Sequence, residues 1–242
     1  MDCEETIVKI VEWLKSKVRT ARMRGLTLGL SGGLDSSVAG ILCKKTGYPT
    51  LGLILPCHSQ RDTVSNAVTL ADKFGIEYKI IDLTETYDRL TMLFKEAIGS
   101  GDPNAEANIK PRLRMLTLYY LANSLSYLVV GTGNYTELRL GYFTKYGDGG
   151  ADLLPLGDLV KGEVRQLASR LGVPEEIVKR PPSADLRPGQ TDEAELGFKY
   201  EVLDKVARGN YSGLPVEVVE AVKKRVSLNR HKRSPPPICR VH

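Results

Sequence analysis

The sequence is poor in cysteine, and it has no long apolar run. Its four cysteines, Cys3, Cys43, Cys57 and Cys239, show neither C-x-x-C spacing nor histidine partners at the intervals of a metal site. This pattern indicates free thiols and argues against a cysteine-based metal centre. No apolar run approaches membrane-spanning length, and the first residues are acidic where a secretory signal would be basic. We therefore expect a cytoplasmic protein.

The chain also lacks a strong excess of charge. Its 34 lysines and arginines stand against 29 acidic residues, a net charge of +5. That balance suits a polyphosphate substrate and does not demand nucleic acid. At 242 residues the chain is long enough to bury a sizeable core. We predict a single domain over residues 1–242, with a helical C-terminal part from about residue 190.

Strand and helix patterns alternate along the chain, which is typical of parallel βαβ units. The pattern predicts an α/β fold: an open, mostly parallel twisted sheet with helices on both faces. Strands are predicted at 26–30, 51–55, 78–83 and 127–130, and helices at 7–18, 36–45, 61–74, 87–98 and 103–124. Ligands of such sheets gather beyond the carboxyl ends of the strands. The loops after Leu30, Leu55, Leu83 and Val130 should therefore face one site.

The segment Leu26–Ser37 is an apolar run that breaks into paired glycines and then a hydroxyl-rich helix start. Glycines let the backbone N–H groups of Ser31 to Ser36 turn toward an anion, and the positive helix end adds its partial charge. These features predict a phosphate cradle. The carboxylate of Asp35 would repel phosphate oxygens unless a divalent cation lay between them, so we also predict Mg²⁺ here.

Three interpretations of this segment compete. In the first, Ser31 and Asp35 only cap a helix. In the second, Gly29 to Gly33 form the G-x-S-x-G elbow of a serine hydrolase, although the elbow needs earlier strands for its oxyanion hole and only one helical segment precedes this one. In the third, S-G-G-x-D-S resembles the loop of ATP pyrophosphatases, which lacks the lysine of a Walker A loop. That resemblance implies that pyrophosphate leaves and an adenylate forms.

The stretch from Gly131 to Gly150 carries six glycines among polar and aromatic residues. It looks too polar and too rich in glycine for a packed element, and its aromatics argue against disorder. A functional loop is therefore predicted, with a structural Ω-loop as the alternative. Within it, Glu137 is a candidate second carboxylate on the metal. Tyr142 or Phe143 is a candidate stacking face for a planar ring, and Lys145 a candidate partner for a carboxylate or phosphate.

A helix is predicted after Asp158, its proposed N-cap, and it should end at Gly172. Its buried stripe is Val160, Val164, Leu167, Ala168 and Leu171. Lys161 would then lie in the first turn, where a cation meets the positive helix end. Either a nearby anion compensates this charge, or Lys161 is a solvated surface residue.

Taken together, these segments resemble a known family. The runs Gly131 to Glu137, Gly141 to Asp152, Pro182 to Leu186, Gly189 to Gly197 and Asn229 to Arg233 closely resemble ammonia-dependent NAD⁺ synthetases of the N-type ATP pyrophosphatase superfamily. The likeness extends from about Ile7 to Arg233. It implies a Rossmann-like fold of the adenine nucleotide alpha-hydrolase type. It also implies ATP-dependent amidation of nicotinic acid adenine dinucleotide (deamido-NAD⁺) with ammonia, giving NAD⁺, AMP and pyrophosphate through an adenylated intermediate.

The resemblance also implies a set of site residues. ATP would be bound by Gly29, Leu30, Ser31, Gly32, Gly33, Leu34, Asp35, Ser36, Thr132, Lys161 and Ser183. Deamido-NAD⁺ would be bound by Arg112, Lys145, Asp152, His231 and Lys232. Asp35 and Glu137 would bind Mg²⁺, and Asp35, Lys161 and Asp152 would be catalytic. We expect Asp152 or Asp148 to take the proton from ammonium.

Partners are also implied. The resemblance predicts a homodimer with dinucleotide sites near the subunit interface, and neither nucleic acid nor membrane as a partner. Nothing in the chain resembles a glutaminase, so free ammonia is the expected nitrogen donor.

Weaker readings of several residues stay open. Arg112 also fits a solvated helix start, His231-Lys232 a disordered or interacting tail, and Thr191 to Glu193 a helix cap. Arg180 to Pro188 and Phe94 to Lys110 are predicted as mobile lids. Among rival functions, an RNA-modifying member of the loop superfamily would need a basic face that a charge of +5 does not supply. A serine hydrolase is the next alternative function, and a non-catalytic nucleotide-binding protein is the last.

Overall fold

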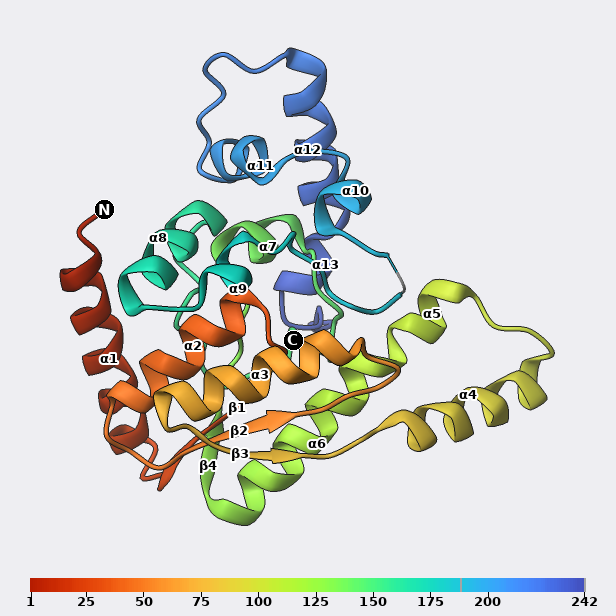
Figure 1. The fold of residues 1–242 in the computed structure, drawn as a ribbon. Helices are drawn as coiled ribbons and strands as arrows, with labels where there is room; N and C mark the ends of the chain where they lie inside the picture. Colours follow the sequence, from red (N-terminus) through yellow and green to blue (C-terminus); the bar gives the residue numbers. More distant parts are fainter. Residues whose placement is uncertain (188, 242) are drawn as a thin grey trace.

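A small parallel sheet lies at the centre of the molecule (Figure 1). The structure is a computed structural model, and it describes residues 1–187 and 189–241. Strands β1 (Gly25–Gly29), β2 (Thr50–Ile54), β3 (Glu77–Ile80) and β4 (Tyr127–Val129) are all parallel and lie in the order β3-β2-β1-β4. The predicted α/β class is therefore confirmed. Because the chain reverses direction of winding between β1 and β4, a topological switch point lies at their carboxyl ends.

Side chains of the strands alternate between two apolar layers, as a strand period of two requires. On one face, Leu26 and Leu28 of β1 pack with helices of the first layer: α1 (Cys3–Thr20), α2 (Leu34–Lys45), α3 (Arg61–Phe74) and α8 (Lys161–Leu171). On the other face, Leu51 and Leu53 of β2 pack with α4 (Thr84–Ile98) and α6 (Ile109–Leu125). Helices α2 and α6 therefore lie on opposite sides of the sheet.

One glycine in β2 is explained by this packing. Gly52 pairs with Leu28 on the face that α2 covers. A Cβ atom on Gly52 would lie 2.3 Å from the side chain of Leu30. Glycine at this position therefore makes room for Leu30, which is almost fully buried at the end of β1.

One predicted helix is divided in the structure, and one predicted strand is shorter than expected. The predicted helix 103–124 is in fact two helices, α5 (Pro103–Ala107) and α6, which meet at Asn108. Pro111 has no N–H with which to continue the hydrogen-bond ladder back to α5, so one unbroken helix was a wrong prediction. Strand β3 is shorter than the predicted 78–83, although the N–H groups of Ile81 and Leu83 still donate to Ile54 and Pro56.

The glycine-rich stretch 131–150 contains a packed helix, contrary to the prediction. Helix α7 (Tyr135–Leu140) begins with a capping box. The Asn134 side chain accepts from the N–H of Glu137 at 3.0 Å, and the Asn134 N–H donates to the Glu137 carboxylate at 3.2 Å. Leu140 at its end is fully buried. Two local hydrogen bonds and one buried leucine stabilise a helix that composition alone conceals.

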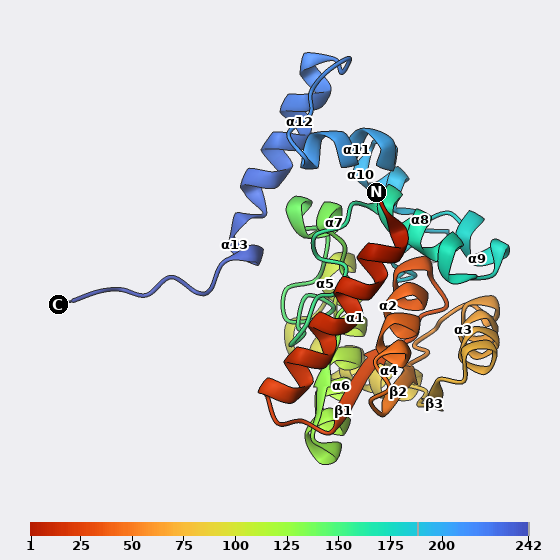
Figure 2. The ribbon, with the colours of Figure 1, turned by 90° about the vertical axis from the view of Figure 1, so that its left-hand side faces the viewer.

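The C-terminal helices form a second apolar cluster beside α7 (Figure 1). Helices α10 (Asp192–Leu196), α11 (Tyr200–Ala207) and α12 (Val216–Leu228) contribute to this cluster. Helix α9 (Glu175–Lys179) instead packs on the main core through Ile177, and α13 (Arg230–Arg233) follows α12. Leu140 of α7 and Tyr200 and Leu203 of α11 lie in this cluster. Beyond α13 the chain runs away from the body (Figure 2). The single-domain organisation of the chain stays a prediction.

Two further sequence predictions concern single features. Cys3, Cys43, Cys57 and Cys239 are free, as predicted. Within residues 1–187 and 189–241, no helix is long and apolar enough to cross a membrane.

Candidate active site

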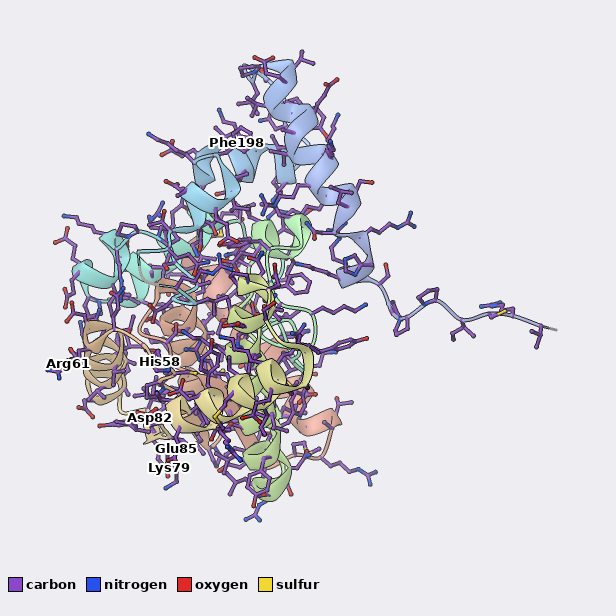
Figure 3. The ribbon with its side chains drawn as sticks, turned by 90° about the vertical axis from the view of Figure 1, so that its right-hand side faces the viewer. His58, Arg61, Lys79, Asp82, Glu85 and Phe198 are labelled. Atoms are coloured by element: carbon purple, nitrogen blue, oxygen red, sulfur yellow. The ribbon has the colours of Figure 1, made fainter. Side chains whose placement is uncertain are left out.

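A cavity of about 460 Å³ opens at the carboxyl ends of the strands. Leu30, Leu55 and Val130 line it, as predicted from the positions of their loops. The loop after Leu83 does not belong to the lining, which contradicts the prediction for that loop. Figure 3 shows Asp82 and Glu85 on the side of the molecule remote from Phe198 of the C-terminal helices. The site therefore lies nearer the β1/β4 switch point than the β3 edge.

The glycine loop between β1 and α2 is held by its own hydroxyl groups. Ser36 Oγ lies 3.0 Å from Ser31 Oγ and donates to the carbonyl of Gly33 at 3.1 Å. Ser37 Oγ donates to the same carbonyl at 2.7 Å. Gly32 has φ +71°, and a Cβ there would lie 2.2 Å from the carbonyl oxygen of Thr63. The tight turn thus needs glycine at this position.

The start of α2 carries no side-chain cap among the described residues. Gly33 is the N-cap residue, and neither Ser31 nor Asp35 caps the helix, so the interpretation of these residues as simple caps is wrong. A buried helix start without a cap leaves backbone N–H groups for a ligand. Ser31 Oγ contacts Ser36 and Gly33, not a described histidine, which leaves the serine hydrolase reading without a general base.

The two predicted metal carboxylates lie on either side of one lysine. Lys161 Nζ is 2.5 Å from Asp35 Oδ2 and 3.2 Å from Glu137 Oε1. The side chains are 4%, 15% and 16% exposed for Lys161, Asp35 and Glu137. Asn134 Nδ2 also donates to Asp35 Oδ1 at 3.1 Å. Residues far apart in the chain therefore meet in one buried charged cluster.

Burial and neighbouring charges set the protonation of this cluster. Burial alone disfavours the charged form of Lys161, but the Asp35 and Glu137 carboxylates outweigh it, so its pKa is raised. Burial raises the pKa of Glu137, Lys161 opposes this shift, and the carboxylate of Asp35 adds to it. The lysine is therefore held as a cation, and the environment of Glu137 shifts its carboxyl group toward the protonated form.

The first turn of α8 shows how the Lys161 cation is tolerated there. The carboxylate of Asp204 accepts from the N–H of Lys161 at 3.3 Å and from that of Gly162 at 2.9 Å. An anion thus lies at the positive helix end, as one of the two readings predicted, and the solvated surface lysine is wrong. The predicted N-cap Asp158 is also wrong: the helix begins after Val160, and Asp158 accepts from Arg208. Asp204 lies far away in sequence, so no local pattern revealed it.

Two residues beside this cluster were missed by sequence reasoning. The Tyr200 hydroxyl donates to Asp192 Oδ2 at 2.9 Å, and its ring lies 5.1 Å from Lys161 Nζ. Asp192 is 4% exposed and also receives the Tyr142 hydroxyl at 3.2 Å. Thr191 does cap α10, as predicted. Asp192 was missed because its place in the first turn of a capped helix already accounted for an acidic residue there. No local pattern indicated its tyrosine partners.

The remaining predicted ATP residues and the two predicted lids meet around the cavity. Thr132 and Ser183 both line it. Lys110, 6% exposed, donates to the carbonyl of Leu186 at 2.9 Å, and Arg187 donates to Asn104 Oδ1 at 2.6 Å. The predicted lids therefore touch each other, and Lys110 at the start of α6 is buried by this contact. Pro188, the last residue of one lid, lies outside the described residues.

Four of the predicted dinucleotide residues lie outside the cavity lining, and three of these are linked to one another. Arg112 Nη2 is 3.4 Å from the carbonyl of Lys145, and Lys145 Nζ donates to the carbonyl of His231 at 2.9 Å. The fourth, Asp152, contacts Tyr119 and Val129. Lys232 does line the cavity and donates to Gly141 and Phe143 carbonyls at 2.8 and 2.9 Å. Residues 230–233 thus form a short docked helix rather than a disordered tail.

The two candidate proton acceptors differ in position. Asp152 Oδ1 accepts from the Tyr119 hydroxyl at 3.0 Å, and Oδ2 accepts from the Val129 N–H at 2.8 Å. Asp148 lines the cavity, and burial raises the pKa of its carboxyl group. Both oxygens of Asp152 are therefore engaged, whereas Asp148 accepts from the Thr144 N–H through Oδ1 at 2.9 Å and lines the cavity.

Comparison with known proteins gives one consistent result. Residues 6–236 match the family model described as NAD synthase. The NH(3)-dependent NAD(+) synthetase of Carboxydothermus hydrogenoformans is 46% identical over 239 residues, covering 97% of each chain.

Solved structures agree with this match. An NMN synthetase from Francisella tularensis is 35% identical with a TM-score of 0.93, covering 99% of each chain. An NH3-dependent NAD synthetase from Campylobacter jejuni is 28% identical with a TM-score of 0.83, covering 99% of this chain and 100% of the other. With its parallel sheet, its glycine loop and a match over almost its whole length, the chain belongs to the NAD synthase family.

Proposed function

We propose that this cavity is the active site in which the chain performs ATP-dependent amidation of deamido-NAD⁺ with ammonia, yielding NAD⁺, AMP and pyrophosphate. The chain is thus a ligase that forms a C–N bond and uses ATP as co-substrate. One observation carries the residue assignments. It is the buried Asp35–Lys161–Glu137 cluster next to the uncapped start of α2.

The chemistry proceeds in two steps. The nicotinate carboxylate attacks the α-phosphate of ATP, a P–O bond to pyrophosphate breaks, and an acyl-adenylate forms. Ammonia then adds to the activated carbonyl and displaces AMP. We assign the β and γ phosphates to the loop from Gly29 to Ser36, with Thr132 and Ser183 as further ATP contacts. Lys161 would neutralise charge that builds on the phosphates, the dominant effect in such transfers.

The donor set fits a magnesium ion. Mg²⁺ is usually held by one or two carboxylates together with substrate phosphates, not by a cage of protein ligands. Asp35 and Glu137 supply two carboxylates that both contact Nζ of Lys161. No group of three or more His, Cys, Asp or Glu side chains suited to a metal occurs among the described residues, so phosphate oxygens would complete the shell. The bound ion would neutralise phosphate charge.

Deamido-NAD⁺ would lie along the other wall. Lys232 lines the cavity beside the ring of Phe143, with its Nζ 5.7 Å from the ring centroid. Arg112, Lys145 and His231 continue from there onto the surface. We assign the planar nicotinate ring to the aromatic end of this path and the charged phosphates of the dinucleotide to its outer end. The position of Asp148 favours it over Asp152 as the acceptor of the ammonium proton.

The enzyme would work as a homodimer. Helices α4 and α6 expose large apolar side chains, including Phe94, Ile98, Leu116 and Tyr120, which are 51%, 72%, 62% and 71% exposed. Such a patch favours a protein partner. Arg112, Leu116 and Tyr120 follow one another at four-residue spacing on α6, so they lie along one helix face. A second copy on this face would lie against the predicted dinucleotide residues. The cytoplasmic location stays a prediction.

The activity is tested by incubation with ATP, Mg²⁺, ammonium and deamido-NAD⁺. We expect NAD⁺ and AMP in equal amounts, with pyrophosphate. Because one similar structure is described as an NMN synthetase, a parallel reaction contains nicotinic acid mononucleotide in place of the dinucleotide. Turnover of the mononucleotide alone would contradict the proposed substrate. Modified tRNA, labelling of Ser31 by a fluorophosphonate, or ATP binding without turnover would support the rival functions.

A further inference from the structure

One partly buried cation in the cavity has no role in the assignments above. Arg114 lies on α6 and lines the cavity. Its Nε donates to the carbonyl of Leu55 at 3.1 Å, and Nη2 donates to Ser59 Oγ at 3.3 Å. Both acceptors follow β2, so the guanidinium is fixed at the carboxyl edge of the sheet. Burial lowers the pKa of this group from its ordinary value.

The guanidinium has unused hydrogen-bonding capacity. Arginine carries five N–H donors, and the two described bonds leave the rest for another partner. Asp148 and Asp185 act on Arg114 electrostatically, yet no carboxylate oxygen of the described chain lies within 4.0 Å of it. A charge that is largely desolvated and unpaired is costly. That cost is offset when an anionic ligand binds.

The wall on which Arg114 lies restricts which anion it meets. The glycine loop, to which the β and γ phosphates are assigned, leads into α2 on one side of the sheet. Helix α6 packs on the opposite side (Figure 1). In phosphoryl and nucleotidyl transfer, the attacking and leaving oxygens lie roughly in line on opposite sides of phosphorus. With the leaving phosphates assigned to the loop at the start of α2, the attacking group is expected on the opposite side of phosphorus, toward the α6 wall.

We infer that Arg114 binds the nicotinate carboxylate of deamido-NAD⁺ before this carboxylate attacks ATP. The inference rests on the proposed function of the cavity. The planar guanidinium presents two parallel N–H groups, which match the two oxygens of a carboxylate. The amide of the product NAD⁺ offers one oxygen and no charge. Arg114 thus distinguishes the substrate from the product and lets NAD⁺ leave.

The test measures affinity for deamido-NAD⁺ and for NAD⁺ by titration calorimetry of the full chain, without ATP or ammonium. Arg114→Gln removes the charge and keeps an amide N–H that can reach Leu55. We expect wild-type protein to prefer deamido-NAD⁺, and Arg114→Gln to reduce this preference about tenfold or more, as expected for a hydrogen bond to a charged group. Arg114→Lys keeps the charge without the fork and should retain part of the preference. Arg19→Gln, an exposed arginine on α1, should leave it unchanged.

The ratio of the two affinities decides the outcome. A pocket that is merely distorted by Arg114→Gln would weaken both dinucleotides alike, and an unchanged ratio overturns the inference. AMP and adenosine are titrated in parallel, because the α-phosphate of ATP is the other reacting oxyanion in the proposed site. A variant that binds AMP more weakly, but adenosine and deamido-NAD⁺ as before, assigns Arg114 to the phosphate and overturns the inference. If Arg114→Gln does not fold, Arg114→Lys decides by the same ratio. Wild-type turnover separates these failures from failure of the proposed function.

Discussion

Lys161 and Asp35 are 126 positions apart in the chain, yet the ammonium of one lies 2.5 Å from the carboxylate of the other. The contact joins the start of α8 to the start of α2. The carboxylate of Glu137, from α7, also lies 3.2 Å from Nζ of Lys161. Three helix starts therefore converge on one buried group, and this convergence defines the phosphate end of the site.

Replacing Lys161 by methionine should reduce kcat by about 100-fold or more, because loss of one preorganised cation or donor at developing charge costs about that much. Steady-state kinetics with ATP, ammonium and deamido-NAD⁺ measures this, with circular dichroism to verify folding. Lys9→Met, at an exposed position on α1, serves as control and should leave kcat unchanged. A Lys161→Met enzyme within about twofold of wild type would remove Lys161 from the mechanism.

Removing the carboxylate of Asp204 should destabilise the start of α8. Asp204 accepts from the N–H groups of Lys161 and Gly162 and from the Thr136 hydroxyl at 2.6 Å. Loss of a helix cap costs about 1–2 kcal/mol. Urea titration should show that Asp204→Ala lowers the free energy of unfolding by at least this amount. Asp204→Asn keeps one acceptor oxygen and should lower the free energy of unfolding less. Equal stability of Asp204→Ala and wild type would show that the cap contributes nothing.

Asp148→Asn should slow amidation about 100-fold or more if Asp148 takes the ammonium proton. Pyrophosphate release in the absence of ammonium should persist, because adenylation precedes proton transfer. Asp152→Asn should change substrate affinity and stability more than the amidation rate, since its carboxylate is bound to Tyr119 and Val129. The reverse pattern in single-turnover experiments would return the acceptor role to Asp152.

The buried thiol of Cys43 should make stability fall at alkaline pH. Burial raises its pKa from 9.0 to about 12, so between these values the folded state keeps a proton that the unfolded state releases. Stability therefore decreases as pH rises through this window, by at most about 1.4 kcal/mol per pH unit. Urea unfolding from pH 8 to 10.5 should show a shallower decrease for Cys43→Ala. The residual slope comes from Cys57 and, near the upper end, from Tyr119, Tyr142 and Tyr200, because burial also raises the pKa of these groups. Cys239→Ala, at an exposed position, should keep the wild-type slope. Identical slopes for wild type and Cys43→Ala would contradict the shift.

Charges placed on the exposed face of α6 should dissociate the proposed dimer. Leu116→Glu combined with Tyr120→Glu buries two carboxylates in an apolar contact, which is costly without partners. Sedimentation velocity should show a dimer for wild type and a monomer for the double variant. Val8→Glu, 60% exposed on α1, is the control and should remain a dimer. A monomeric wild-type chain would contradict the proposal directly.

Local patterns predicted much of the fold. Helix α3 runs from Arg61 to Phe74 and ends at Gly75, as predicted, because an apolar period of 3.6 and a left-handed glycine are both local signals. The parallel sheet follows from alternating strand and helix patterns. The same reasoning failed at Pro111, where one predicted helix is divided into α5 and α6. It also failed at Asn134, where a capping box starts a helix inside a glycine-rich stretch that was predicted to be a loop.

The sequence by itself determined the glycine loop, the alternation of strands and helices that places this loop at the carboxyl ends of parallel strands, and the family resemblance. Hydrogen bonds within a few residues and apolar periodicity are enough for these. Tertiary structure alone decided that Lys161 is buried between Asp35 and Glu137 and that Asp204 rather than Asp158 holds the start of α8. It also decided that Arg114 lines the cavity with no carboxylate partner among residues 1–187 and 189–241. Electrostatic interactions depend on distance through space, and no spacing along the chain encodes which distant charges folding brings together.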